Sequence, residues 1–176
     1  EKKYSYSDTV FLFSAIFDTD EWLKLDKGTI TEEEALSTFI ERNPEKENIL
    51  REVMSDFYSI FTPIESSVEI LKHLRNKGYT LLFLSNIHLG IYKYIIDKYD
   101  FFKEFNGGII SSKVKMLKPG KGIFFDLIKK YNIVPEESIF IDDTAHNIKT
   151  ANKLGFVTIH LTDPADLKKE LKVLGI

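Results

Sequence analysis

Polar residues that could handle a phosphate group follow apolar segments at three places in this sequence. Each place supplies a different kind of group: a hydroxyl with an amide, an ammonium, and two adjacent carboxylates. A hydroxyl can donate to phosphate oxygens, an ammonium neutralises their charge, and carboxylates supply oxygen ligands to Mg²⁺. The residues concerned are Ser85 and Asn86, then Lys118, then Asp142 and Asp143.

Each of these residues also has an ordinary structural role. A serine after a strand is often a helix cap, and a lysine before a proline is usually a solvated loop residue. Two aspartates before a helix often only stabilise that helix, because negative charge is favourable at its N-terminus. Their order, spacing and positions at segment ends make the combination informative, so we expect these groups to meet at one site.

The segments that must position these groups change in character near position 78. Upstream, apolar residues recur at helical spacing, and Thr31 with Glu34 has the spacing of a capping box. Downstream, short apolar runs alternate with helical segments, which predicts an α/β fold with a doubly wound parallel sheet. Ligands bind beyond the carboxyl ends of such strands. The expected strands are 79–85, 108–111, 138–141 and 156–160, and the expected helices are 29–40, 48–61, 66–77, 91–99, 122–131, 147–154 and 164–174.

The composition of the 176 residues narrows the class of protein further. There is no cysteine, which excludes thiolate zinc sites and cysteine nucleophiles, and the four histidines lack zinc-ligand spacing. His88 and His146 lie just beyond expected strand ends, but we favour core or surface roles for them. A net charge of -3 and short apolar runs argue against nucleic-acid and membrane partners. We expect a cytoplasmic protein.

Three segments resemble motifs II, III and IV of the haloacid dehalogenase-like (HAD) hydrolase superfamily. They are LSN at 84–86, KPGKGIF at 118–124 and IFIDDTAHNIKTANKLG at 139–155. The resemblance implies a Rossmann-like core in which catalytic Ser85 binds phosphate with Asn86 beside it. It also implies that catalytic Lys118 stabilises the phosphate and the nucleophile, and that Asp143 with Asp142 holds Mg²⁺.

The segment EWLKLDKGTITEEEA at 21–35 resembles the small helical cap of one HAD subgroup. That subgroup includes sugar-1-phosphate phosphatases and the phosphatase domain of bifunctional epoxide hydrolases. We therefore expect a helical cap region in residues 1–62 and an α/β core in 63–176. The resemblance implies a Mg²⁺-dependent phosphohydrolase of a small phosphorylated metabolite, with a sugar phosphate favoured, working through an aspartyl-phosphate.

The nucleophilic aspartate of this reaction should end an apolar strand in an Asp-x-Asp motif. Asp18-Thr19-Asp20 is the only local match, but the cap resemblance runs through it and Glu21 follows where a small turn is wanted. We therefore expect Asp18 and Asp20 to be surface residues of a cap helix. The nucleophile is then expected upstream of Glu1, and the core is expected to lack its first strand.

Two other functions fit the same residues. A metal-independent 2-haloacid dehalogenase would use this core, although two adjacent carboxylates suit a cation better than a halide. A non-catalytic protein that binds a phosphorylated ligand is the alternative from a different class. Metal dependence separates the first alternative from a phosphatase, and binding without turnover would identify the second.

Overall fold

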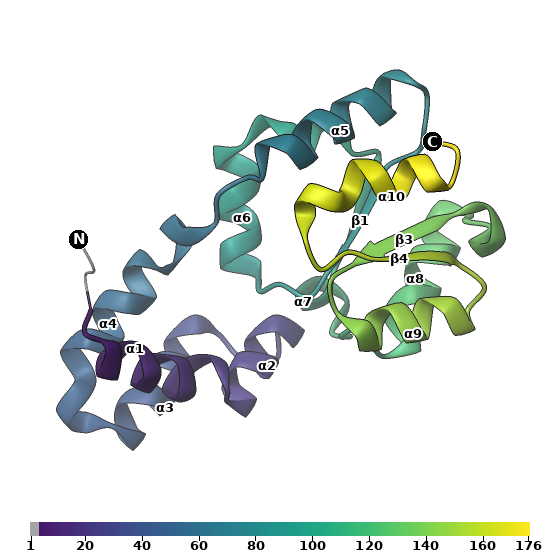
Figure 1. Cartoon of the computed structure of the whole chain (residues 1–176). Helices are drawn as coiled ribbons and strands as arrows, with labels where there is room; N and C mark the ends of the chain where they lie inside the picture. Colours follow the sequence, from purple (N-terminus) through teal and green to yellow (C-terminus); the bar gives the residue numbers. More distant parts are fainter. Residues whose placement is uncertain (1–3) are drawn as a thin grey trace.

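The computed structural model describes residues 4–176 and consists of a helical half and an α/β half (Figure 1). All strands of the described chain lie in the second half, between residues 82 and 160. No helix in residues 4–176 is long and apolar enough to cross a membrane. The helical half comprises α1 (Tyr6–Leu12), the π-helix η1 (Phe13–Phe17), α2 (Asp20–Lys27), α3 (Glu32–Arg42), the 3-10 helix η2 (Pro44–Lys46), α4 (Glu47–Asp56) and the 3-10 helix η3 (Phe57–Ile60).

The helix predicted from the capping box forms where its sequence signals place it. The Thr31 hydroxyl accepts a hydrogen bond from the Glu34 N–H, and the Glu34 carboxylate accepts one from the Thr31 N–H at 2.7 Å. The preceding helix α2 ends at Gly28, whose φ of +70° favours glycine. These local signals set the turn that leads from α2 into α3.

The helical half has an apolar core of its own. Leu12 and Ile16 from the first helical segment pack with residues of α2, α3 and α4. Phe39 in α3 and Leu50 in α4 are completely buried. Because this cluster draws only on residues before 55, the helical half packs largely on itself.

The α/β half follows the predicted alternation of strands and helices. The first strand begins at Leu82 rather than at Tyr79, and the helical segments at 6–17 and 111–114 were not among the predicted elements. The α/β half comprises α5 (Glu65–Asn76), β1 (Leu82–Ser85), α6 (Leu89–Lys98), η4 (Asp100–Glu104), β2 (Gly107–Ile110), α7 (Ser111–Val114), α8 (Lys121–Tyr131), η5 (Pro135–Glu137), β3 (Ile139–Asp142), α9 (Ala145–Lys153), β4 (Val157–His160), η6 (Pro164–Asp166) and α10 (Leu167–Val173).

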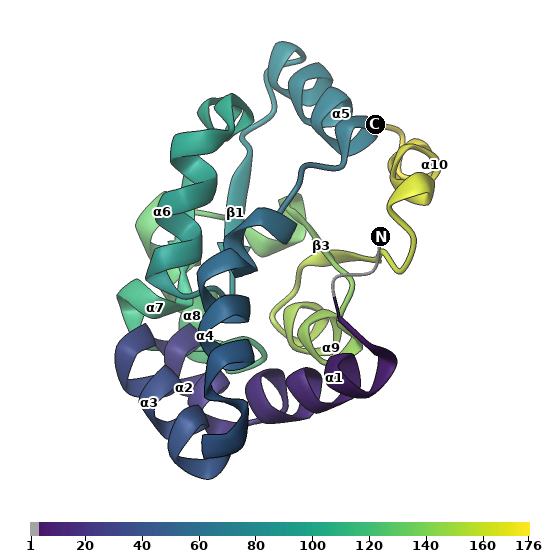
Figure 2. The ribbon, with the colours of Figure 1, turned by 90° about the vertical axis from the view of Figure 1, so that its left-hand side faces the viewer.

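The strands form two separate parallel pairs. β1 pairs with β2, with Ser85 opposite Ile110, and β3 pairs with β4, with Asp142 opposite His160. No hydrogen bonds join β1 to β3 in the described chain, and Figure 2 shows the two strands apart. Parallel pairing is as predicted, but the sheet is interrupted in its middle.

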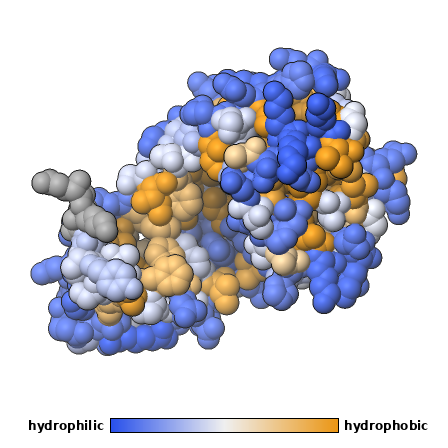
Figure 3. All heavy atoms as spheres, in the orientation of Figure 1, coloured by the Kyte–Doolittle hydropathy of each residue, from blue (hydrophilic) through white to orange (hydrophobic). Residues whose placement is uncertain are grey.

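A groove of about 1020 Å³ lies between the two strand pairs. Its lining is mainly apolar and includes both β1 and β3 together with α5 and α10. Ile141, in the middle of β3, is 37% exposed because this side of its strand is open. The space-filling view shows that the molecule is also hollowed between its two halves, with apolar side chains around the hollow (Figure 3).

Candidate functional site

An ion pair joins the loop between α7 and α8 to the end of β3. The Lys118 ammonium lies 2.6 Å from Asp142 Oδ2, and both side chains are less than 10% exposed. The other carboxylate oxygen, Oδ1, accepts hydrogen bonds from the Thr144 N–H and the Asn147 amide, each at 2.9 Å. Burial would raise the pKa of Asp142, but Lys118, Asn147 and Thr144 together hold it below its ordinary value. Asp142 is therefore held as a carboxylate.

Asn86 connects the end of β1 to the same lysine. Its side-chain amide donates to the Lys118 carbonyl at 2.9 Å, and its amide oxygen accepts from the Lys118 N–H at 2.8 Å. Ser85, the last residue of β1, is partly buried beside it. The three predicted groups thus meet at the carboxyl ends of β1 and β3.

Asp143 is arranged differently from its neighbour. Its side chain is exposed, and one carboxylate oxygen accepts from the Thr144 hydroxyl at 3.2 Å. A carboxylate has about four acceptor positions. Asp142 has three of them filled by described residues, whereas Asp143 has one filled, by the Thr144 hydroxyl.

The residues present suit a Mg²⁺ ion that takes only part of its ligands from the protein and the rest from water and substrate. Residues 4–176 contain no group of three or more histidine or acidic side chains that could hold a metal ion. Mg²⁺ commonly uses one or two carboxylates and completes its shell with water and substrate phosphate. The pair Asp142 and Asp143 suits that arrangement.

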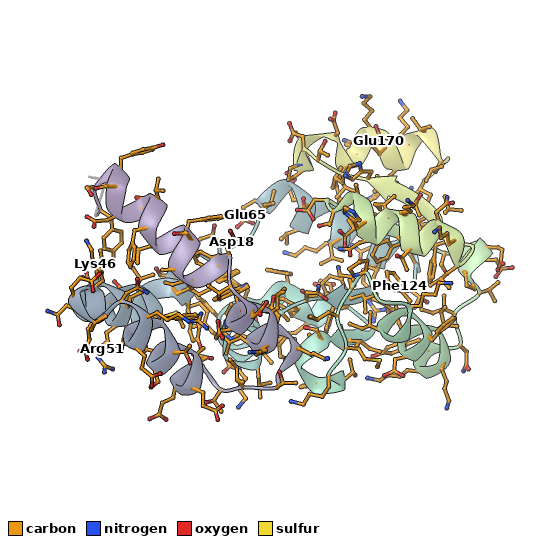
Figure 4. The ribbon with its side chains drawn as sticks, turned by 90° about the horizontal axis from the view of Figure 1, so that it is seen from below. Asp18, Lys46, Arg51, Glu65, Phe124 and Glu170 are labelled. Carbon is orange, nitrogen blue, oxygen red and sulfur yellow. The ribbon has the colours of Figure 1, made fainter. Side chains whose placement is uncertain are left out.

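The local Asp-x-Asp match lies in the helical half. Asp18 is the exposed residue that ends η1, and Asp20 is the exposed first residue of α2. Figure 4 labels Asp18 in the helical half, on different elements from Phe124 of the α/β half. The prediction that these two aspartates are surface residues of helical segments is confirmed, since neither ends a strand.

The sequence reasoning missed a second polar cluster beside the site. His88, three residues after Ser85, is 2% exposed, and its Nδ1 lies 3.2 Å from Glu32 Oε1. The Tyr58 hydroxyl donates to the same carboxylate at 2.5 to 2.6 Å. Burial raises the pKa of Asp26, which lies against the backbone N–H of His88, to about 6. No sequence signal joins these residues, because three come from separate helical segments and one from the core.

This chain matches the model of a known protein family. A family model for haloacid dehalogenase-like hydrolases matches residues 16–155. The chain therefore belongs to the haloacid dehalogenase-like hydrolase family, and its fold is the α/β core of that family.

Solved structures and curated relatives agree with this assignment. A predicted HAD-like hydrolase of Porphyromonas gingivalis superposes with a TM-score of 0.71 at 21% identity, over 97% of this chain and 90% of that one. A HAD family enzyme of Bacteroides thetaiotaomicron, solved as an aspartate-to-alanine mutant with magnesium and inorganic phosphate, gives a TM-score of 0.69 at 25% identity over 86% and 80% of the two chains. A sesquiterpene phosphatase of Aspergillus oryzae is 23% identical over 97% of this chain and 94% of its own length.

Other relatives match only in part. Acyl-CoA dehydrogenase family member 10 of mouse is 28% identical over 89% of this chain, but the chain spans only 15% of that protein. The D-ribitol-5-phosphate phosphatase of Bacteroides thetaiotaomicron is 35% identical over 37% of this chain and 32% of its own length. The family is thus a hydrolase family with several phosphatases among the relatives of this chain.

Proposed function

We propose that this chain belongs to a Mg²⁺-dependent phosphohydrolase that acts on a small phosphorylated metabolite. The observation that carries the proposal is the buried Lys118–Asp142 pair, hydrogen-bonded through Asn86 to the end of β1. It brings a hydroxyl, an amide, an ammonium and two carboxylates, which suit a phosphate and a cation, to one edge of a hydrolase core. Relatives named as phosphatases support the same reaction.

In this proposal each residue has one role. Ser85 and Asn86 bind phosphate oxygens, and Lys118 neutralises charge on the phosphate and on the attacking carboxylate. Asp143 and Asp142 would hold Mg²⁺, which when bound supplies further positive charge beside the phosphate. A sugar phosphate is the first substrate to test, because the segment at 21–35 resembles the cap of sugar-phosphate phosphatases.

We further propose that the nucleophilic aspartate lies upstream of Glu1, on a strand that fills the groove. A strand between β1 and β3 would pair with both unpaired edges and, if parallel, would end beside Ser85 and Asp142. Its terminal aspartate would attack phosphorus, the alcohol would leave, and water would then release phosphate from the aspartyl-phosphate. Residues 1–62 would act as a cap over the core of 63–176, closing the site to bulk water.

The experiment is a turnover assay of the intact polypeptide, including any residues before Glu1. A panel of sugar phosphates and other small phosphomonoesters is assayed with Mg²⁺ and with EDTA. We expect turnover that EDTA abolishes and that Asp143→Asn lowers roughly 100-fold, while the control Asp126→Asn leaves it unchanged. Turnover of 2-haloacids that resists EDTA would favour a dehalogenase. Phosphate binding without any turnover would favour a non-catalytic protein.

A further inference from the structure

The loop that leaves β1 is fixed at successive residues, and its last fixed residue is His88. Asn86 exchanges two hydrogen bonds with the backbone of Lys118. The next residue, Ile87, donates its N–H to the hydroxyl of Ser111 at 2.9 Å. His88 then begins α6 as its N-cap. The position of His88 thus bounds the short loop that begins at Ser85, three residues earlier in the chain.

The helical half contacts this loop through His88. The imidazole packs edge-to-face against Trp22 with ring centroids 5.5 Å apart, and the Tyr58 ring lies 6.1 Å away. His88 Nδ1 lies 3.2 Å from Glu32, and the carboxylate of Asp26 lies against the His88 N–H. The pKa of Glu32 is lowered because His88, and then Tyr58, favour its ionised form against the cost of burial.

Two neighbouring residues, Ser111 and Gly90, also allow the two halves to approach closely. The completely buried hydroxyl of Ser111 also donates to the carbonyl of Asp26 in α2, so one serine holds both the loop and the helical half. A Cβ atom on Gly90 would lie 1.9 Å from Glu32 Oε1 and 2.1 Å from the Tyr58 hydroxyl oxygen. Only glycine leaves room there for the carboxylate to reach the N-terminus of α6, where its charge is favourable.

If the His88 imidazole only filled space at this position, an apolar ring would give a more stable fold. Both ring nitrogens of His88 are buried and lack a hydrogen-bond partner among residues 4–176, so the 3.2 Å approach to Glu32 is a close contact without hydrogen-bond geometry. A buried polar group without such a partner lowers folding stability, whereas an apolar ring of similar shape does not. The contact with the Glu32 carboxylate is what an apolar ring would lose.

We propose that His88 is a positioning residue whose contact with Glu32 holds the helical half against the loop 85–88. The contact sets Ser85 and Asn86 for phosphate when the cap is closed. The part of this inference that concerns phosphate rests on the proposed function, whereas the contact between the two halves does not.

Trp22, the single tryptophan of this chain, reports on the contact directly. Glu32→Gln keeps an acceptor for the Tyr58 hydroxyl but removes the charge that faces His88. Losing one such polar contact should favour, roughly tenfold, an arrangement in which the helical half is separated from the loop 85–88. We expect a red-shifted Trp22 emission and stronger quenching by acrylamide. Glu33→Gln, exposed on the same helical turn, is the matched control. Equal quenching in both variants would overturn the proposal.

The positioning role is tested with His88→Phe in the intact polypeptide. This variant keeps the ring and removes the unpaired nitrogens, so the midpoint of thermal unfolding should be maintained or raised. Its affinity for inorganic phosphate, measured by calorimetry with Mg²⁺, should fall roughly tenfold because the helical half no longer holds the His88 end of the loop. His73→Phe, exposed on α5, is the control and should bind like the wild type.

The outcomes separate this inference from the proposed function. If the wild type and His88→Phe bind phosphate equally well, His88 does not position the loop and the proposal is wrong. If the wild type binds no phosphate, the proposed function fails. The Trp22 measurement then still decides whether Glu32 and His88 hold the two halves together.

Discussion

At the scale of single residues, the environment of each carboxylate determines what it can do. Asp142 is buried yet ionised because an ammonium and two further donors compensate its burial. Asp26 is partly buried with weaker compensation, so burial raises its pKa to about 6. Asp143 stays exposed, and the described residues fill only one of its acceptor positions. Similar side chains in one region thus have three different electrostatic roles.

Lys118→Met should leave the Asp142 carboxylate buried without its counter-ion. We expect a loss of about 3 kcal/mol in the free energy of unfolding at pH 7, measured by urea denaturation. The lowered pKa of Asp142 stabilises the fold above the ordinary aspartate pKa, and this stabilisation disappears as pH falls through the folded-state pKa. In the variant the folded-state pKa of Asp142 should rise, so the loss of stability on acidification should become smaller. Lys129→Met, at an exposed lysine of α8, should change stability little.

Asp26→Asn should remove the cost of keeping a charge at a buried position. The raised pKa of Asp26 means that its contribution to stability is greatest below the unfolded-state value of 3.8 and declines as pH rises through about 6. The variant should therefore gain up to about 3 kcal/mol at pH 7.5 and lose the slope between pH 4 and 6.5. Asp20→Asn, exposed in the same helix, is the control. A less stable Asp26→Asn protein with an unchanged slope would contradict this account.

At the scale of elements, the first turn of α6 contains a residue of low helix propensity, Gly90, that allows close contact with the helical half. Gly90 lies inside this helix, where alanine would ordinarily be preferred by about 1 kcal/mol. The space for a Cβ is already taken by Glu32 and Tyr58 of the helical half. The contact between elements therefore outweighs the local preference of one helix.

Gly90→Ala should consequently change the contact between the two halves while it changes the free energy of unfolding little. The free energy of unfolding should change by less than about 1 kcal/mol, because the gain in helix propensity offsets the lost contact. Trp22 should nevertheless become more accessible to acrylamide, as in Glu32→Gln. In a background carrying Glu32→Ala and Tyr58→Phe, where the side-chain atoms nearest to the new methyl group are gone, the same substitution should stabilise. No gain there would show that another contact opposes it.

At the scale of the whole molecule, the open groove is the main irregularity. The buried core of the α/β half is split, with one cluster around Phe124 and Phe140 and a second around Ile159 and Leu171. The apolar surface between β1 and β3 faces a groove rather than another strand. A strand in that groove would join the two clusters and pair the unpaired strand edges.

Ile141→Lys tests whether the groove is filled in the intact polypeptide. In residues 1–176 alone, the new ammonium can reach water through the groove, so stability should change by less than about 1 kcal/mol. With a strand in place the charge would be buried, and the loss should exceed about 3 kcal/mol. Val157→Lys changes a β4 residue of similar exposure that does not line the groove, and should be mild in both proteins. A mild effect of Ile141→Lys in both would argue against the strand.

The sequence by itself determined the features that depend on local signals. The capping box of α3, the alternation of elements after position 78 and the three site segments are each readable within a few residues. They sufficed to predict a parallel α/β fold and to bring Ser85, Lys118 and Asp142 to one edge of it. They sufficed also to assign Asp18 to the surface of a helical segment rather than to a strand end.

Only the tertiary structure decided which groups are buried together. The cluster of His88, Glu32, Tyr58 and Asp26 joins segments up to 62 residues apart in the chain, and no local pattern records such a contact. The interrupted sheet is likewise a property of strand pairing rather than of any one strand. Burial, charge pairing and pKa depend on the distances between distant segments, which the order of residues does not state.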